Sequence, residues 1–177
     1  MKRRALVLGG VGLAAAAAGV GIAQWRLAVP ARSAADIAAE AAFWGMRFDA
    51  PGGGDLAMAS LRGQPLLLNF WATWCAPCVK EMPLLDAFFK QQQAAGWRVV
   101  GLAVDSPTPV RSDLARLPIS VPIGLAGMEG AELTRSLGNP SGSLPFSVVF
   151  DRRGEAVDRK LGQIAEADFE RWRRLLG

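Results

Sequence analysis

The sequence contains no histidine and only two cysteines among its 177 residues. Histidine is the side chain most often used to bind metal ions and to carry protons near neutral pH. Two thiolates without histidine would leave a tetrahedral zinc shell half empty, so the sequence argues against a zinc site. We expect no metal and no cofactor, and any proton chemistry must use carboxylates, thiols or water.

The start of the chain has no acidic residue, and the rest of the chain has no excess of basic residues. Residues 1–32 contain five basic residues and no acidic one, which leaves 15 basic and 16 acidic residues in the remainder. The sequence pI of about 9.7 therefore reflects the leader. No basic patch with interleaved aromatic residues marks a nucleic-acid surface. We expect no nucleic-acid partner.

The leader begins MKRR and continues with nineteen uncharged residues, Ala5 to Ala23. A charged start before an apolar stretch is typical of an export signal or a membrane anchor. The length favours an anchor, because a membrane span needs about 20 residues. The many alanines and glycines weaken insertion. Arg3-Arg4 resembles a bacterial twin-arginine signal, although Lys2 stands where serine or threonine is usual.

Each of these leaders keeps the basic end in the cytoplasm and places the domain outside it. We expect residues 5–23 to anchor the chain to the inner membrane and expose the domain to the bacterial periplasm. The alternative is export followed by cleavage after Ala23 or Ala31. A buried N-terminal helix of the domain fits the charge asymmetry less well. Disulfides persist in the extracytoplasmic compartment.

The remaining chain is long enough for one domain. Continuous apolar runs predict strands buried on both faces at Leu66–Trp71 and Trp97–Val104. A helical pattern runs from Ala76 to Gln93. Further elements are predicted as hairpins at 46–58 and 146–161, a strand at 121–125, and helices at 33–44, 110–117, 129–137 and 165–176. This order predicts an α/β fold with a central mixed sheet flanked by helices.

Both cysteines lie in the stretch NFWATWCAPCVKEMP, which covers residues 69–83. A Cys-X-X-Cys between a buried strand and a helix is a redox motif. The helix N-terminus favours a thiolate at Cys75, and Pro77 fits the first helical turn. We expect Cys75 to attack a partner's disulfide and Cys78 to resolve the mixed disulfide. A loop this short would be a poor structural staple.

The sequence NFWATWCAPC, with LRGQP upstream and SLPFSVVFDRRG downstream, resembles the TlpA-like thiol–disulfide oxidoreductases of the thioredoxin superfamily. The resemblance covers about residues 43–176. It implies a thioredoxin fold with an N-terminal β-hairpin extension, preceded here by a hydrophobic N-terminal helix. The resulting domain limits are 1–29 for the signal or anchor, 30–42 for a linker and 43–177 for the thioredoxin-like domain.

The same resemblance implies an activity and partners. Such proteins reduce the disulfides of client proteins, often in cytochrome c or copper-centre assembly. They receive electrons from a membrane donor of the thiol-relay type. We therefore expect client thiols and disulfides, a membrane donor and, through the N-terminal segment, the membrane itself as partners.

Further site residues follow from the resemblance. Pro145 stands where thioredoxin-like proteins carry a cis-proline that faces the disulfide. Its neighbours Leu144 and Ser143 are the expected docking residues for the client. Trp74, next to the first cysteine, is a candidate for lining that surface.

Glu81 follows Cys78 by three residues, on the same face of the predicted helix. A carboxylate in this position could exchange a proton with the Cys78 thiol. The alternative is a solvated charge on the helix surface. Classical thioredoxins have a buried aspartate where this chain has Asn69, which cannot titrate. The acid–base role therefore passes to Glu81 or to water.

Two other functions compete with the dithiol reductase. A peroxidase of the peroxiredoxin type needs a proline and a threonine upstream of the attacking cysteine, and Ala72-Thr73-Trp74-Cys75 supplies only the threonine. A copper carrier of this fold would use a histidine beside the two cysteines. The identity of the client and the direction of electron flow do not follow from the sequence.

Overall fold

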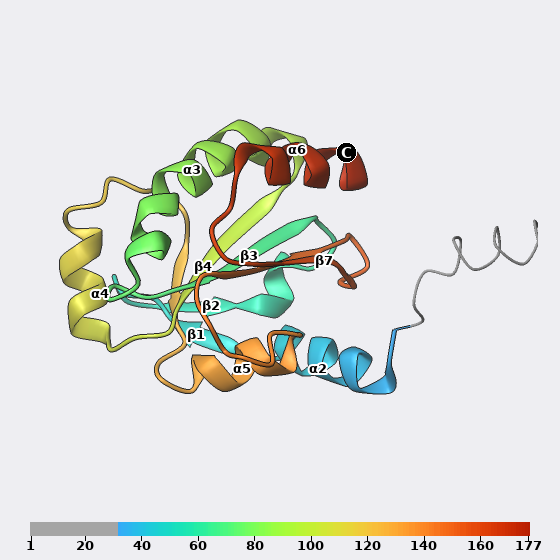
Figure 1. Ribbon diagram of the computed structural model, residues 1–177, viewed down its shortest axis with the longest axis horizontal. Coiled ribbons are helices and arrows are strands. Elements are labelled where there is room, and N and C mark those ends of the chain that lie inside the picture. Colours follow the sequence, from blue (N-terminus) through green and yellow to red (C-terminus); the bar gives the residue numbers. More distant parts are fainter. Residues whose placement is uncertain (1–31) are drawn as a thin grey trace, which may run out of the picture. The chain divides into compact units, whose positions relative to one another are not determined.

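Residues 32–177 are described by a computed structural model, and the predicted signal or anchor segment lies outside them. Helices alternate along the chain with single strands or pairs of strands (Figure 1). The α-helices are α2 (Ala34–Trp44), α3 (Ala76–Gln92), α4 (Pro107–Leu114), α5 (Gly130–Ser136) and α6 (Glu166–Leu176). The strands are β1 (Arg47–Asp49), β2 (Asp55–Ala57), β3 (Leu66–Trp71), β4 (Arg98–Ala103), β5 (Ile123–Leu125), β6 (Phe146–Phe150) and β7 (Ala156–Leu161).

All seven of these strands join one sheet in the order β2-β1-β5-β4-β3-β6-β7. The three central strands β5, β4 and β3 run parallel to one another, and β6, β7, β1 and β2 add antiparallel pairs on either side. Antiparallel pairing of β3 with β6 brings Phe70 opposite Phe146. The end of β3 and the start of β6 therefore lie at the same edge of the sheet.

Two hydrophobic clusters cover the two faces of this sheet. Successive strand residues point to opposite faces, and β3 divides accordingly. Leu67 and Trp71 join the cluster that contains residues of α3, α4 and α6, whereas Leu66, Leu68 and Phe70 join the cluster of α2 and α5. Figure 1 shows α3 and α6 on one side of the sheet and α2 and α5 on the other.

Two residues, Cys75 and Pro77, set the start of helix α3. Cys75 is the N-cap residue, with an extended backbone, and Pro77 lies in the first turn, where a proline costs no hydrogen bond. After α3, a short 3-10 helix leads to Gly96, whose φ of 91° is left-handed and favours glycine. The backbone N–H of Trp97 donates to the Gln92 carbonyl at 3.2 Å and starts the return to β4.

The predicted strands at 66–71, 146–150 and 156–161 are confirmed at both ends. The helix predicted at 110–117 is instead α4, three residues earlier. The sequence predicts a loop at Pro107 and Pro109, between the strand at 97–104 and the helix at 110–117. Both prolines instead lie within the first turn of α4, where prolines are tolerated. The strand predicted from residue 121 begins at Ile123, directly after Pro122, which has no N–H for pairing.

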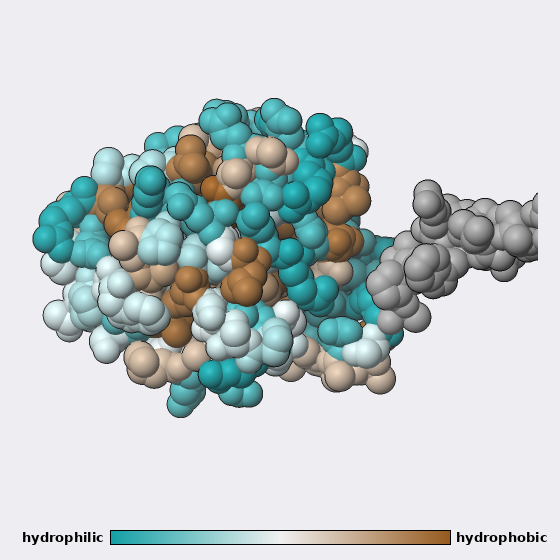
Figure 2. Space-filling model, viewed as in Figure 1, coloured by the Kyte–Doolittle hydropathy of each residue, from teal (hydrophilic) through white to brown (hydrophobic). Residues whose placement is uncertain are grey.

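Residues Ala34–Gly177 form one compact unit. Helix α2 belongs to it, because Phe43 and Trp44 are buried and both rings pack on Phe150. The domain limit at residue 43 stays a prediction. Within residues 32–177, the structure contains no helix with the length and apolar composition that a bilayer crossing requires. Figure 2 shows a largely hydrophilic face on which hydrophobic residues form small separate groups.

Candidate redox site

The two cysteines form a disulfide at the N-terminus of α3. The S–S bond is 2.06 Å long and the two Cα atoms are 5.3 Å apart. Cys78 is completely buried, whereas Cys75 keeps 6% of its surface accessible. Its neighbours Trp74, Ala76 and Pro77 are exposed. Only the Cys75 side of the disulfide is therefore open to another protein.

The predicted docking residues lie at the start of β6. The peptide bond between Leu144 and Pro145 is cis, as the resemblance implies. Leu144 packs against the hydrophobic cluster that contains both cysteines. Ser143 is exposed, and its carbonyl accepts a hydrogen bond from the Asn139 amide at 2.8 Å. Trp74, with 64% of its surface exposed, adds a large apolar side chain beside Cys75.

Glu81 is not a solvated charge on the helix surface, because none of its surface is exposed. Its Oε1 accepts a hydrogen bond from Asn69 Nδ2 at 2.8 Å, and its Oε2 accepts one from the backbone N–H of Ile164 at 2.7 Å. These donors come from β3 and from the segment after β7. The sheet and the loop therefore hold the carboxylate from two sides.

Burial raises the pKa of the Glu81 carboxyl above its ordinary value, because a buried carboxylate loses its hydration. The hydrogen bonds from Ile164 and Asn69, and the positive charge of Lys160, act in the opposite direction and lower it. Desolvation is the largest of these effects. The pKa of Glu81 is therefore raised, which makes its carboxylate a stronger base than an exposed one.

The alternation of side chains on β3 corrects one further expectation about this pKa. From the motif alone, the expected apolar neighbours that raise this pKa are Trp71, Trp74 and Phe70. Phe70 lies in the cluster on the opposite face of the sheet, and Trp74 is largely exposed. Of the three, only Trp71 is buried in the cluster that contains Cys78.

Asn69 is fully buried and joins Glu81 to a third element, β6. Its Nδ2 also donates to Ser147 Oγ of that strand at 3.0 Å, and Ser147 is itself fully buried. Sequence analysis missed Ser147. The signal that could have found it is the antiparallel pairing of β3 with β6, in which Ser147 lies opposite Asn69.

A second carboxylate, Asp105, fastens the loop that carries the first cysteine. Asp105 Oδ2 accepts hydrogen bonds from the backbone N–H and the hydroxyl of Thr73, at 3.0 and 2.6 Å, and Oδ1 accepts one from the N–H of Ser106. The sequence places Asp105 in a loop, between the predicted strand at 97–104 and the predicted helix at 110–117. Its position directly after the second buried strand could have revealed it, since parallel neighbouring strands end at the same edge of a sheet.

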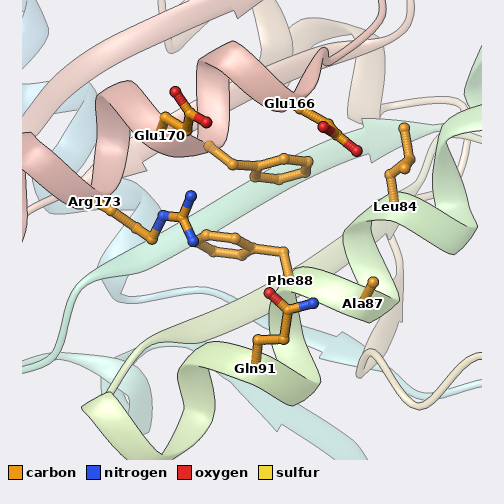
Figure 3. A pocket seen from close by; sticks show the side chains of 8 residues that line it. Leu84, Ala87, Phe88, Gln91, Glu166, Glu170 and Arg173 are labelled. Carbon is orange, nitrogen blue, oxygen red and sulfur yellow. The ribbon is translucent and has the colours of Figure 1, made fainter.

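A separate pocket of about 220 Å³ lies between α3 and α6 (Figure 3). Glu166, Glu170 and Arg173 project from α6, and Phe88 and Gln91 from α3. Neither cysteine lines this pocket, so it is not the redox site. Among residues 32–177, no group of three or more histidine, cysteine or acidic side chains is placed to hold a metal ion.

A disulfide at the start of a helix, on a central mixed sheet with a cis-proline at the same sheet edge, defines the class of thioredoxin-fold proteins with a Cys-X-X-Cys disulfide. Residues 38–175 match the Redoxin family, and the chain belongs to that family. The thioredoxin superfamily assignment made from the sequence is confirmed, and the TlpA-like resemblance is consistent with it.

Curated relatives and solved structures agree with this class. Thiol-disulfide oxidoreductase ResA of Bacillus cereus is 28% identical over 120 residues, which are 67% of this chain and 66% of that protein, just under two thirds of its length. A thiol:disulfide interchange protein of the thioredoxin family from Chlorobium tepidum TLS is 27% identical, with a TM-score of 0.66 and coverage of 73% and 91%. A secreted thiol-disulfide isomerase from Corynebacterium glutamicum shows the same fold at 24% identity, with a TM-score of 0.61 and coverage of 70% and 78%.

Proposed function

We propose that this protein is an extracytoplasmic thiol–disulfide oxidoreductase that reduces disulfides in client proteins. The observation that supports this function best is the Cys75–Cys78 disulfide at the start of α3, with the buried carboxylate of Glu81 one helical turn further on. The relatives named as thiol-disulfide oxidoreductases support the same activity. Reduction of clients in cytochrome c or copper-centre assembly is the specific form that we propose.

The reaction begins from the dithiol form of the protein. The Cys75 thiolate attacks one sulfur of a client disulfide, forms a mixed disulfide with it and releases the other client sulfur as a thiolate. Cys78 then loses its proton and attacks the Cys75 sulfur, which restores the Cys75–Cys78 disulfide and releases the second client thiolate. Two electrons have passed to the client. The unequal exposure of the two cysteines supports this order, because only Cys75 reaches the surface.

Glu81 takes the proton that Cys78 releases. A buried thiol holds its proton more tightly than a free one, so the resolving step needs a base. The chain has no histidine and Asn69 does not titrate. Glu81 lies three residues after Cys78 on α3, and its raised pKa makes it a stronger base than an exposed carboxylate.

The client docks over Trp74, Pro77 and the segment Ser143–Pro145. The exposed indole of Trp74 offers apolar surface on one side of Cys75. Leu144 and Ser143 stand at the start of β6, at the sheet edge where β3 ends. This arrangement favours an unfolded or loop segment of a client that carries its disulfide to Cys75.

The compartment and the electron donor follow from the leader and from the chemistry. The basic and apolar start of the chain supports export or anchoring at the bacterial inner membrane, and a periplasmic position for the domain. The oxidised protein must receive two electrons before each further turnover. We propose a membrane dithiol protein as that donor.

Trapping with Cys78→Ser tests the proposed function. The variant keeps the attacking Cys75 but cannot resolve the mixed disulfide, so client proteins should accumulate on Cys75 and be released by dithiothreitol. Cys75→Ser is the matched control and should trap nothing. Absence of any trapped protein, together with turnover of hydrogen peroxide by the wild-type protein, would identify a peroxidase instead.

The peroxidase finds no support in the geometry of Thr73. In the sequence, Thr73 is the one residue that fits the upstream pattern of such enzymes. In the structure, its hydroxyl and its backbone N–H both donate to Asp105. Thr73 therefore serves to hold the loop before Cys75.

A further inference from the structure

The two oxygens of Glu81 are arranged for a carboxylate and not for a carboxylic acid. Oε1 faces the Asn69 Nδ2 donor at 2.8 Å, and Oε2 faces the Ile164 N–H donor at 2.7 Å. An ionised carboxylate accepts both hydrogen bonds. Once Glu81 takes a proton, it gains an O–H donor, and an O–H that points towards Asn69 or Ile164 meets a second donor. A proton in that position is hydrogen-bonded only if the partner there offers an acceptor.

Of these partners, only Asn69 can become an acceptor. The group contributed by Ile164 is a backbone N–H, which can only donate. An asparagine amide carries an acceptor oxygen and a donor nitrogen on opposite sides, and half a turn about its Cβ–Cγ bond exchanges them. Asn69 Oδ1 is buried, and it has no hydrogen-bond partner among the residues that the structure describes. The amide therefore loses no hydrogen bond to the protein at that end when it turns.

Ser147 fits both orientations of the amide. Its Oγ lies 3.0 Å from Asn69 Nδ2, from which it accepts a hydrogen bond. After the turn, Oδ1 takes the place of Nδ2, and the Ser147 hydroxyl rotates to donate to it. A hydroxyl has both a donor and acceptor sites, so the contact survives with its direction reversed.

We propose that Asn69 is a positioning residue whose amide turns when Glu81 gains or loses a proton, so that the carboxyl stays hydrogen-bonded both as base and as acid. This inference rests on the proposed function, in which Glu81 exchanges a proton with Cys78. It accounts for an amide at this position. A second carboxylate would repel the first, and an apolar side chain would leave Glu81 Oε1 without a partner.

The charges near Glu81 act on the same equilibrium. The positive charge of Lys160, on β7, favours the ionised carboxylate. Lys160 is paired in turn with Asp168 of α6, at 3.5 Å between Nζ and Oδ2. Removal of the Lys160 charge should therefore move the titration of Glu81 to higher pH. The pH at which the Asn69 amide turns should rise by the same amount.

The sequence offers a simple spectroscopic test, because it contains only two asparagines, Asn69 and Asn139. The full chain is labelled with ¹⁵N at the asparagine side-chain amides and titrated in its oxidised form by NMR, with the Glu81 carboxyl carbon followed in parallel. Asn139 is the internal control. Its amide is bonded at both ends, to the Ser143 carbonyl and the Ser141 hydroxyl.

We expect nuclear Overhauser contacts from the Asn69 amide protons to Ser147 and Glu81 above the Glu81 midpoint and their loss below it. The Asn139 contacts should stay unchanged throughout. In Lys160→Gln, the loss should shift to higher pH together with the carboxyl signal, and in Glu81→Gln no pH-dependent change should occur. Contacts of Asn69 that persist through the Glu81 titration would overturn the proposal. So would a loss of these contacts at a pH unrelated to the carboxyl midpoint.

Asn69→Leu adds a second measurement. This variant removes a hydrogen bond that favours the ionised carboxylate, so the Glu81 midpoint should rise. An unchanged midpoint would show that the Asn69 amide does not act on Glu81. The titration needs no client and no electron transfer. Its failure is therefore distinct from failure of the trapping experiment, which tests the redox function itself.

Discussion

A single buried carboxylate carries the acid–base chemistry proposed for this protein. Glu81 is fully buried on a helix whose neighbouring residue Lys80 is exposed, so its burial is specific to its position. Burying a carboxylate is costly unless hydrogen bonds compensate. Asn69 and Ile164 supply two such bonds. Retention of an ionisable group at this cost is typical of a functional site.

The exchange rate should depend on Glu81 in a pH-dependent way. Glu81→Gln removes the base that accepts the Cys78 proton, and we expect disulfide exchange to slow by about 10²–10⁴-fold. The measurement is the pH–rate profile of client reduction. Glu129→Gln changes an exposed acid at the start of α5, a helix that carries neither cysteine, and is the control that should keep the wild-type profile. Superimposable profiles for Glu81→Gln and wild type would refute the role.

The stability of the wild-type protein should depend on pH through Glu81, in the opposite sense from a surface ion pair. The pKa of Glu81 is raised in the folded state, so the folded protein holds a proton over a range in which the unfolded chain has lost it. The free energy of unfolding therefore falls as the pH rises from the ordinary glutamate pKa through the folded-state pKa. Glu81→Gln escapes this loss. In urea unfolding, the free energy of unfolding of the variant should increase relative to that of the wild type as the pH rises above about 4.

Reactivity should separate the two cysteines. In the disulfide form, Cys75 stands at the helix N-terminus beside exposed residues and Cys78 is enclosed, and we expect the same difference after reduction. We expect iodoacetamide to modify Cys75 first at every pH near neutral. Mass spectrometry of the partly alkylated protein measures this order. Faster modification of Cys78 would reverse the assigned roles.

At the scale of elements, the loop between β3 and α3 is held by a contact to the end of β4. Asp105 accepts two hydrogen bonds from Thr73 and one from Ser106. The loop carries Trp74 and Cys75, so this carboxylate sets the position of the exposed side of the disulfide. It lies on a different element from either cysteine.

Asp105→Ala should loosen this loop. The variant leaves the donors of Thr73 and Ser106 without their partner, and we expect it to lower the free energy of unfolding by about 1–3 kcal/mol. Thr73→Val removes only the hydroxyl bond and should cost about 0.5–1.5 kcal/mol. Urea unfolding gives both values. An equal loss in the two variants would mean that the backbone contact contributes nothing.

Helix α6 should show acid-sensitive stability through Asp168. Burial would raise the pKa of this carboxyl, but hydrogen bonds from Ala165 and Arg171 and the charge of Lys160 outweigh it and lower the pKa. The stabilisation is therefore present above the ordinary aspartate pKa and is lost as the pH falls through the folded-state pKa.

Asp168→Ala should lower stability at neutral pH by about 0.5–2 kcal/mol, as for the loss of a helix cap. The difference from the wild type should shrink as the pH falls below the ordinary aspartate pKa. Glu170→Ala changes an exposed acid of the same helix and should stay within about 0.5 kcal/mol. A constant difference between Asp168→Ala and wild type at all pH values would exclude the ionised carboxylate as its cause.

At the scale of the whole molecule, local patterns predicted the elements more successfully than the contacts between them. The strand Leu66–Trp71 follows from a continuous apolar run, and the start of α3 follows from the placement of Cys75 and Pro77. The contact of Asp105 with Thr73 joins residues 32 positions apart. The contact of Asn69 with Ser147 joins residues 78 positions apart. Spacing along the chain carries no information about such pairs until the order of the strands is known.

The unit Ala34–Gly177 should fold and react without the leader. Both hydrophobic clusters of the described structure draw their residues from Phe43 onward. A chain lacking residues 1–31 should therefore keep the urea midpoint and the rate of client reduction of the full chain. Its net charge should fall, because the removed segment carries basic residues and no acidic ones. A lower midpoint would show that the leader contributes to the fold.

The burial of Glu81 links the reduction potential of the protein to pH. The reduction potential of a two-electron couple changes by about 29.6 mV for each tenfold change in its equilibrium constant. In the proposed mechanism Glu81 takes the Cys78 proton as the disulfide forms. Across the pH range in which Glu81 is protonated in the disulfide form and ionised in the dithiol form, the slope of potential against pH is therefore shallower by about 30 mV per unit. Within that range, acidification weakens this protein as a reductant less than it weakens a dithiol with no such carboxylate. One buried carboxylate then makes electron transfer less sensitive to pH.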